Sequence, residues 1–214
     1  MRSQIKQVAT ELLITHGVRG LRFGDIAERL GITRANIHYH FGTKRNLVEE
    51  AIEEYLDGTL EQLGAIWSDE TLSYEEKARR TMEFNRTRYE KFNSRGTGGR
   101  PWSLISRMRL EADQLTPRSR AALQRFSEAI ETHVNDAVLR AQAEGEIAAD
   151  APTRDVAVQL VAIVDSAGSI TQDAASFDRL EHLYTAYVRI IGHAYGGKKA
   201  GPQRRSLTAV AKRS

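Results

Sequence analysis

The spacing of apolar residues most constrains the fold of this chain, because it repeats every three or four positions along most of its length. Ile5, Val8, Ala9, Leu12 and Leu13 follow one another at i, i+3, i+4, i+7 and i+8. This spacing puts all five on one face of a helix. Alternating patterns typical of strands are rare, and only four of the 214 residues are proline. The sequence therefore predicts an all-α protein.

Capping residues divide this pattern into about nine helices. Gly31 and Gly42 are placed to end helices, whereas Thr33, Thr43 and the pair Thr116-Pro117 are placed to begin them. The expected helices run from the start of the chain to about residue 16, and then over about 23–30, 34–41, 44–67, 74–93, 101–113, 117–143, 153–174 and 176–195.

Charge divides the chain into three parts. The net charge is +4 over residues 1–44, −7 over 45–195 and +6 over 196–214. We expect a small N-terminal domain at 1–45, a larger helical domain at 46–195 and a disordered basic tail at 196–214, which has few apolar residues. Positive charge at the two ends favours a polyanionic partner, although a short basic stretch is also typical of a solvated face.

Two absences narrow the class of protein. The chain has no cysteine, which removes disulfides and thiolate metal sites. No apolar run approaches the ~20 residues of a membrane-spanning helix, and the first residues have the pattern of a helix, not of a targeting segment. We therefore expect a cytoplasmic protein with no membrane partner and no cofactor.

The segment at 23–41 has the organisation of a helix-turn-helix, in which a helix ends at Leu30, a Gly-Ile turn follows and a short helix begins at Arg34. On the short helix Ile37 and Phe41 point inward, and Ala35 and Tyr39 point outward. The outward face suits the DNA major groove, where Arg34 can pair with guanine and Asn36 with adenine. Tyr39 can reach a phosphate or a thymine methyl group, with His38 beside it and His40 at the margin of the buried face.

Phosphate contacts are expected at the ends of the neighbouring helices. Arg22 and Lys44 begin the second and fourth helices, and Thr43 with the first amides of the fourth helix can hold another phosphate. His38 and His40 cannot share a metal ion, because residues two apart lie on different sides of a helix. Catalysis by these histidines lacks an evident partner. A helix-turn-helix that binds no DNA remains an alternative.

The run FGDIAERLGITRANIHYHFGTKRNLVEEAI at 23–52 resembles the tetracycline-repressor (TetR) family of transcriptional regulators. The resemblance covers about residues 1–52 and implies a dimeric repressor that a ligand releases from DNA. The DNA-contacting positions that it implies are Thr33, Arg34, Asn36, Tyr39, His40 and Lys44. Two residues depart from the family pattern, since His38 stands where Tyr is common and Arg22 where a capping Thr or Ser is common.

The last two helices favour a dimer. Apolar residues surround most of the helix at 153–174, which must therefore be covered on nearly all sides. We expect both helices to meet their copies in a second subunit, through Val164, Ala167, Gly168, Tyr184, Tyr187, Val188 and Ile191. The alternative is a core within one chain.

The central helices carry large side chains that are candidates for a ligand pocket, although most of them are simply expected in the core. They are Met82, Phe84, Tyr89, Trp102, Met108, Phe126 and His133. The sequence predicts a dimeric repressor that leaves a palindromic operator on binding an unidentified small molecule. An activator or a non-sensing DNA-binding protein is the main alternative, and an enzyme is disfavoured because no catalytic motif is present.

Overall fold

The computed structural model describes residues 1–93 and 98–197, and in these ranges the chain forms nine α-helices and one 3₁₀ turn. The elements are α1 (Arg2–Gly20), α2 (Phe23–Leu30), α3 (Arg34–Phe41), α4 (Lys44–Ser68), α5 (Tyr74–Phe92), α6 (Leu104–Leu110), η1 (Ala112–Gln114), α7 (Pro117–Ala143), α8 (Thr153–Ala174) and α9 (Asp178–Tyr195). This architecture confirms the all-α prediction. Most of the expected basic tail lies outside the described residues.

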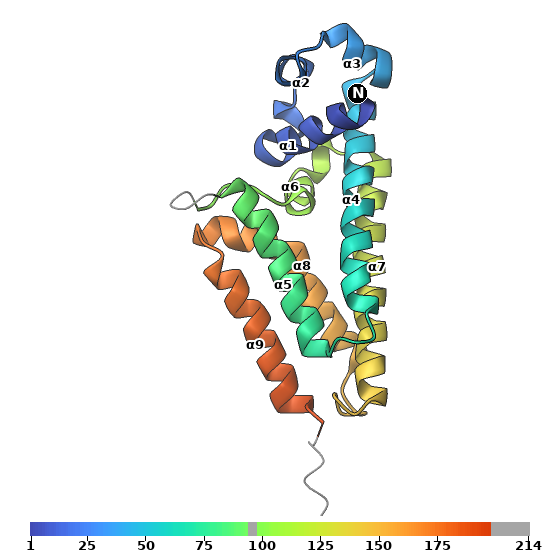
Figure 1. The fold of residues 1–214 in the computed structure, drawn as a ribbon, viewed down its shortest axis with the longest axis vertical. Coiled ribbons are helices and arrows are strands. Elements are labelled where there is room, and N and C mark those ends of the chain that lie inside the picture. Colours follow the sequence, from blue (N-terminus) through green and yellow to red (C-terminus); the bar gives the residue numbers. More distant parts are fainter. Residues whose placement is uncertain (94–97, 198–214) are drawn as a thin grey trace, which may run out of the picture.

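Helices α1, α2 and α3 form a small unit at one end of an elongated molecule (Figure 1). Helix α2 ends at Gly31, which adopts the left-handed conformation with φ 63°. The Thr33 side chain then caps α3 by accepting a hydrogen bond from the Asn36 backbone amide. These two residues fix the turn between α2 and α3, as the sequence predicted.

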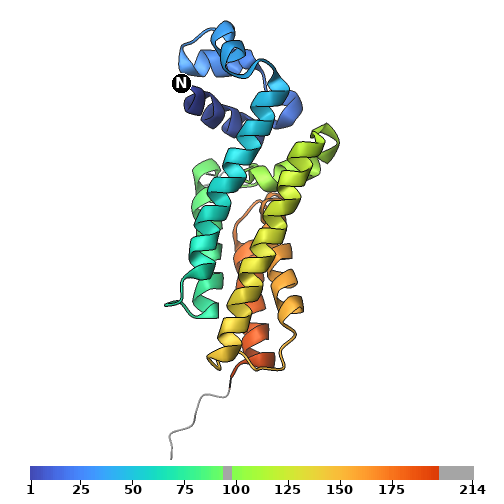
Figure 2. The same cartoon turned by 90° about the vertical axis from the view of Figure 1, so that its right-hand side faces the viewer.

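Helix α4 is continuous over 25 residues and connects the small unit to the rest of the chain. Its N-cap is Thr43, which accepts from the amide of Asn46 at 3.2 Å. Along its length it packs against α7, and the two helices lie side by side in both views (Figures 1 and 2). Helix α4 is therefore the one continuous helix that reaches from the α1–α3 unit into the body among the described residues.

Helices α5 to α9 form the body of the molecule. Helix α8 is in contact with α6, α7 and α9, so the body itself covers most of its apolar circumference. Val156, Ala157 and Leu160 are at most 1% exposed. Helices of the same chain therefore cover much of the α8 surface that was expected to need a partner subunit.

Two helix boundaries differ from the expected ones. Helix α6 begins at Leu104 instead of near Pro101, because the Ser103 side chain caps it and the Trp102 ring is buried, with its Nε1 donating to Thr171 Oγ1 at 2.7 Å. Helix α1 continues beyond Gly17 after a kink at that residue, where φ is 70°. The Glu111 carboxylate accepts from the Val18 amide at 2.8 Å and so caps the segment after the kink.

Candidate DNA interface, effector cleft and dimer face

The outer face of α3 carries large and polar side chains that are exposed to solvent. The Tyr39 side chain is 87% exposed, while Ile37 and Phe41 on the opposite face are at most 4% exposed. Thr33, Arg34, Ala35, Asn36 and His38 are exposed as well, and His40 is half-buried. The inward and outward sets predicted for this helix are therefore confirmed.

The Asn36 side chain caps the start of α3 and is also a candidate for contact with a base. Its Oδ1 accepts from the Thr33 amide at 3.2 Å and contacts the Thr33 hydroxyl, which completes a capping box. Because that oxygen is engaged, only the side-chain NH₂ of Asn36 is free to face a base. A pairing with adenine that also uses this oxygen therefore requires the capping box to open.

Arg34 lies over the beginning of α2, at Gly24. A Cβ built on Gly24 would stand 2.9 Å from Arg34 Nη2, so the missing side chain makes room for the guanidinium. Gly24 was not among the functional residues predicted from the sequence. Its contribution depends on how closely α2 and α3 approach, which no spacing rule gives.

The two histidines of α3 support the helix from within the unit. His38 Nδ1 donates to the Gly42 carbonyl at 2.9 Å, and its ring packs edge-on against Phe23 with 4.8 Å between ring centroids. The His40 ring lies edge-on against Tyr39 at 5.3 Å, and its backbone carbonyl accepts from Arg2. His38 and His40 therefore position α3 and Tyr39. Among the described residues, no group of three potential ligands could hold a metal ion.

Arg22 and Lys44 gather positive charge beside α3. Burial and then the charge of Arg22 lower the pKa of the Lys44 ammonium. In the part of the chain that the structure describes, no carboxylate lies within ion-pair distance of Arg22, Arg34 or Lys44. Cations that repel one another and lack an acidic partner are suited to phosphate oxygens. Thr43 is exposed at the N-terminus of α4, where its hydroxyl caps the helix.

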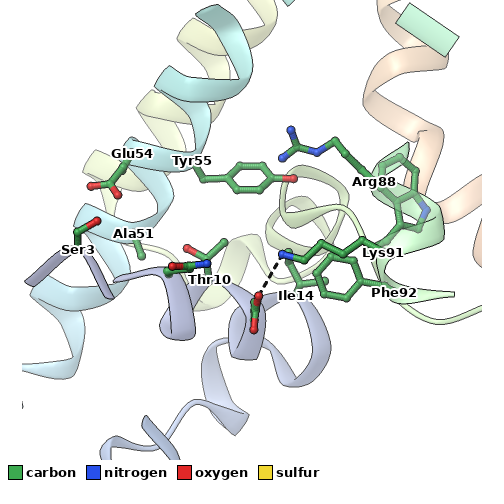
Figure 3. A pocket seen from close by; sticks show the side chains of 12 residues that line it. Ser3, Thr10, Ile14, Ala51, Glu54, Tyr55, Arg88, Lys91 and Phe92 are labelled. Carbon is green, nitrogen blue, oxygen red and sulfur yellow. Dashed lines mark hydrogen bonds and ion pairs between the residues drawn. The ribbon is translucent and has the colours of Figure 1, made fainter. Parts of the chain in front are cut away.

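A cleft of about 470 Å³ lies where α1 meets α4 and α5. Figure 3 shows Tyr55 reaching into it from α4, Arg88 and Lys91 from α5, and Thr10 and Ile14 from α1. Its volume falls in the range of about 300–1,000 Å³ that is typical of small-molecule sites. The cleft therefore lies between the α3-bearing unit and the body.

The ligand candidates predicted from the sequence do not converge on this cleft. Only Trp102 lines it, while Met108 is fully buried, Tyr89 packs against Trp102 and Phe177, and Met82 and Phe126 line separate grooves. His133 is half-buried beside Gly64. The large side chains chosen from the sequence belong mainly to the core of the body. The polar residues that line the cleft were not predicted.

Most of the expected dimer residues are buried within their own chain. Ala167, Tyr184, Tyr187 and Ile191 are at most 5% exposed, and Gly168 is buried with its amide donating to Ser106 Oγ at 3.1 Å. Val164 and Val188 are half-buried. The physical reason is that α5, α6 and α7 pack against α8 and α9, so the apolar side of each helix faces its own chain.

An apolar stripe on the other side of α8 and α9 remains accessible. On α9, Ile190 is 60% exposed and Leu183 and Ala186 are half-buried, at positions i, i+3 and i+7. On α8, Ile163 and Ile170 are half-buried. Residues with this spacing share a helix face, and this stripe is the candidate dimer face.

Comparison with protein-family models matches both parts of the chain. Residues 5–51 match the model for bacterial regulatory proteins of the tetR family, and residues 104–188 match the model described as tetracyclin repressor-like, C-terminal domain. The two matches together cover the helix-turn-helix and most of the body.

Individual proteins agree with the family models. The chain is 30% identical over 56 residues to the HTH-type transcriptional repressor KstR2 of Mycolicibacterium smegmatis, a match that covers 26% of this chain and spans about a quarter (27%) of that repressor. A TetR regulator from Chloroflexus aurantiacus superposes with a TM-score of 0.75 at 19% identity, over 92% of this chain and 96% of that one. A TetR regulator from Legionella pneumophila gives 0.73 at 21% identity, over 88% and 95%.

Proposed function

Because the chain belongs to the TetR family of bacterial regulatory proteins, we propose that it is a dimeric repressor of transcription that a small organic molecule releases from a palindromic operator. In this proposal the domain at residues 1–45 reads DNA, and the domain at 46–195 binds the ligand and the second subunit. A regulator that binds DNA has to be in the compartment that holds the DNA, so we propose that the protein works in the cytoplasm. The relative that is 30% identical over 56 residues is a repressor by name, and repression is the direction of regulation that we propose.

The observation that carries the proposal is the exposure of Tyr39 on a helix whose other face is fully packed. Exposing so large an aromatic side chain to water has no benefit for folding, whereas contact with a thymine methyl group or a phosphate gives it a partner. Arg34 and the NH₂ group of Asn36 extend from the same exposed face. These three side chains are the proposed base readers.

Arg22, Thr43 and Lys44 are the proposed phosphate contacts. They lie at the N-termini of α2 and α4, on either side of the recognition helix α3. Phosphate contacts fix the register of a protein on DNA without reading its sequence. His38 and His40 act indirectly, by holding α3 and Tyr39 in place.

Dimerisation would double this surface. We propose that the stripe formed by Ile163, Ile170, Leu183, Ala186 and Ile190 meets its copy across a two-fold axis, which would make a four-helix contact from α8 and α9. Two copies of α3 separated by about 34–36 Å, or a multiple of it, then read half-sites in successive major grooves.

Ligand release requires coupling between the body and α3. The continuous helix α4 provides it, together with the ion pair between Arg118 of α7 and Glu53 of α4 at 2.5 Å. A ligand shifts the protein between two orientations of the α3 unit only if it binds one of them better. Coupling of about 1–3 kcal/mol, or 5- to 150-fold in affinity, is typical.

Selection of bound sequences from random duplex DNA tests the proposal. We expect enrichment of a two-fold symmetric sequence with half-sites about 10 base pairs apart, or a multiple of that spacing. Enrichment of nothing beyond background would contradict DNA reading, and enrichment of a single asymmetric site would contradict the dimer. A reporter gene driven from the selected operator, with and without the protein, then distinguishes repression from activation.

A further inference from the structure

We propose that the cleft between α1, α4 and α5 binds an organic carboxylate with a flat apolar body, and that the Arg88 guanidinium holds the carboxylate. The proposal rests on the proposed function only in calling this molecule the effector. It assigns a chemical class to the ligand and places the ligand at the junction with the DNA-binding unit.

Arg88 is the one cleft cation without a carboxylate among the residues that the structure describes. It is half-buried, and its guanidinium lies over the Tyr55 ring at 4.6 Å and the Phe84 ring at 4.8 Å. Stacking on two rings orients the planar group and leaves its N–H edge free. An oriented guanidinium is preorganised for the two parallel hydrogen bonds that a carboxylate accepts.

The other charges of the cleft already have partners. Glu54 is paired with Lys6, and Glu11 is paired with Lys91 at 3.1 Å and lies 3.7 Å from Arg29. The acidic groups that face the cleft are thus neutralised by neighbours other than Arg88. The uncompensated charge is positive, which favours an anion over a neutral or cationic ligand.

The remaining lining of the cleft combines three polar side chains of α1, Ser3, Gln7 and Thr10, with aromatic and apolar ones. Tyr55, Phe92, Trp102 and Ile14 line it together. The indole N–H of Trp102 is already donated to Thr171, so this side chain contributes no free hydrogen-bond donor to the cleft. A flat apolar body can pack against these rings while its carboxylate reaches Arg88.

Occupation of this cleft has a direct route to the DNA-binding unit. Lys91 lies three residues after Arg88 on α5, and residues at this spacing are neighbours on one helix face. A carboxylate held by Arg88 therefore competes with Glu11 for Lys91, and the Lys91–Glu11 pair is a link between α5 and α1 (Figure 3). The ligand weakens that link and packs against Thr10 and Ile14 of α1.

Calorimetric titration of the full-length protein with 2-naphthoate tests the site, with 2-naphthamide as the neutral analogue of the same shape. We expect naphthoate to bind, and naphthamide to bind about tenfold or more weakly because it lacks the charge. Arg88→Gln should weaken naphthoate binding by a similar factor. The matched control is Arg86→Gln on the same helix, whose side chain pairs with Glu181 and should leave naphthoate binding unchanged.

Equal binding of naphthoate and naphthamide would overturn the proposal, as would no binding of naphthoate at about 1 mM or full binding by Arg88→Gln. The comparison of the two probes on the wild-type protein decides the question even if Arg88→Gln does not fold. Operator affinity, measured separately, distinguishes the two proposals. If naphthoate binds but does not weaken operator binding, the site stands and its role as the effector site is overturned. If the protein binds its operator but not naphthoate, the site is overturned and the DNA-binding proposal stands.

Discussion

In the helix-turn-helix the polar side chains of α3 face solvent, whereas in the body many polar side chains are buried and bonded to one another. The contrast is clearest for two tyrosines. Tyr39 is 87% exposed, while Tyr187 is 5% exposed and its hydroxyl donates to the Val156 carbonyl at 2.8 Å. The same residue type thus contributes a solvent-exposed surface in one region and a buried hydrogen bond in the other, according to what surrounds it. Substitutions in the two regions should therefore affect different measurements.

The largest expected effect is on stability, in the apolar core of the body. Ile130→Ala on α7 removes a side chain that is 1% exposed, and we expect the free energy of unfolding to fall by about 2–5 kcal/mol. Leu139→Ala on the same helix removes a side chain that is 50% exposed and should cost much less. Urea unfolding at one protein concentration measures both, and equal losses would contradict the assigned core.

Removing one hydroxyl group from each of the two tyrosines should have different effects on stability. Tyr187→Phe leaves the buried Val156 carbonyl and the Tyr74 hydroxyl short of a partner, so we expect a loss of about 1–3 kcal/mol in unfolding free energy. Tyr39→Phe should change that energy by less than about 0.5 kcal/mol. A stability loss at Tyr39 as large as that at Tyr187 would remove the distinction between the two regions.

Salt dependence tests the cationic side of the DNA-binding unit. Lys44→Ala should lower the affinity for all DNA sequences alike and reduce the slope of log K against log salt by about 0.9. Arg79→Ala removes the same charge from the body, where Arg79 is paired with Glu76, and should leave the slope unchanged. Binding assays between low and moderate salt concentration give the slope, and equal slopes for Lys44→Ala and the wild type would exclude a phosphate contact.

The weakest effect that we expect is a pH dependence of the unfolding free energy that comes from Asp165 in the body. Burial raises the pKa of the Asp165 carboxyl above its ordinary value of 3.8, against the lowering effects of Arg109 and Ser127. Between 3.8 and the raised pKa the folded chain holds a proton that the unfolded chain has released, so the unfolding free energy falls as pH rises. The Asp165→Asn variant should lack this fall. Parallel stability curves for variant and wild type across this window would show that Asp165 does not cause it.

Local signals in the sequence predicted the helix-turn-helix well. The caps at Thr33 and Thr43 and the opposite faces of α3 depend on residues within one or two turns of each other, and the structure confirms them. Helix propensity and periodicity act over this same short range.

The cleft depends on distant parts of the chain and was not predicted. Thr10, Tyr55 and Arg88 come from three helices, and their meeting is set by how α1 packs on α4 and α5. Four of the expected dimer residues, Ala167, Tyr184, Tyr187 and Ile191, are buried within their own chain for a similar reason. Periodicity shows that Ala167 and Tyr187 face apolar surroundings, but it does not show whether these belong to the same chain.

The operator affinities of Arg34→Ala and Tyr39→Ala show whether the exposed face of α3 reads base pairs. With an operator selected by the wild-type protein, each variant should lose about 1–3 kcal/mol of discrimination between operator and random DNA, while its urea unfolding stays close to that of the wild type. Full discrimination by both variants would show that these side chains of α3 do not read base pairs.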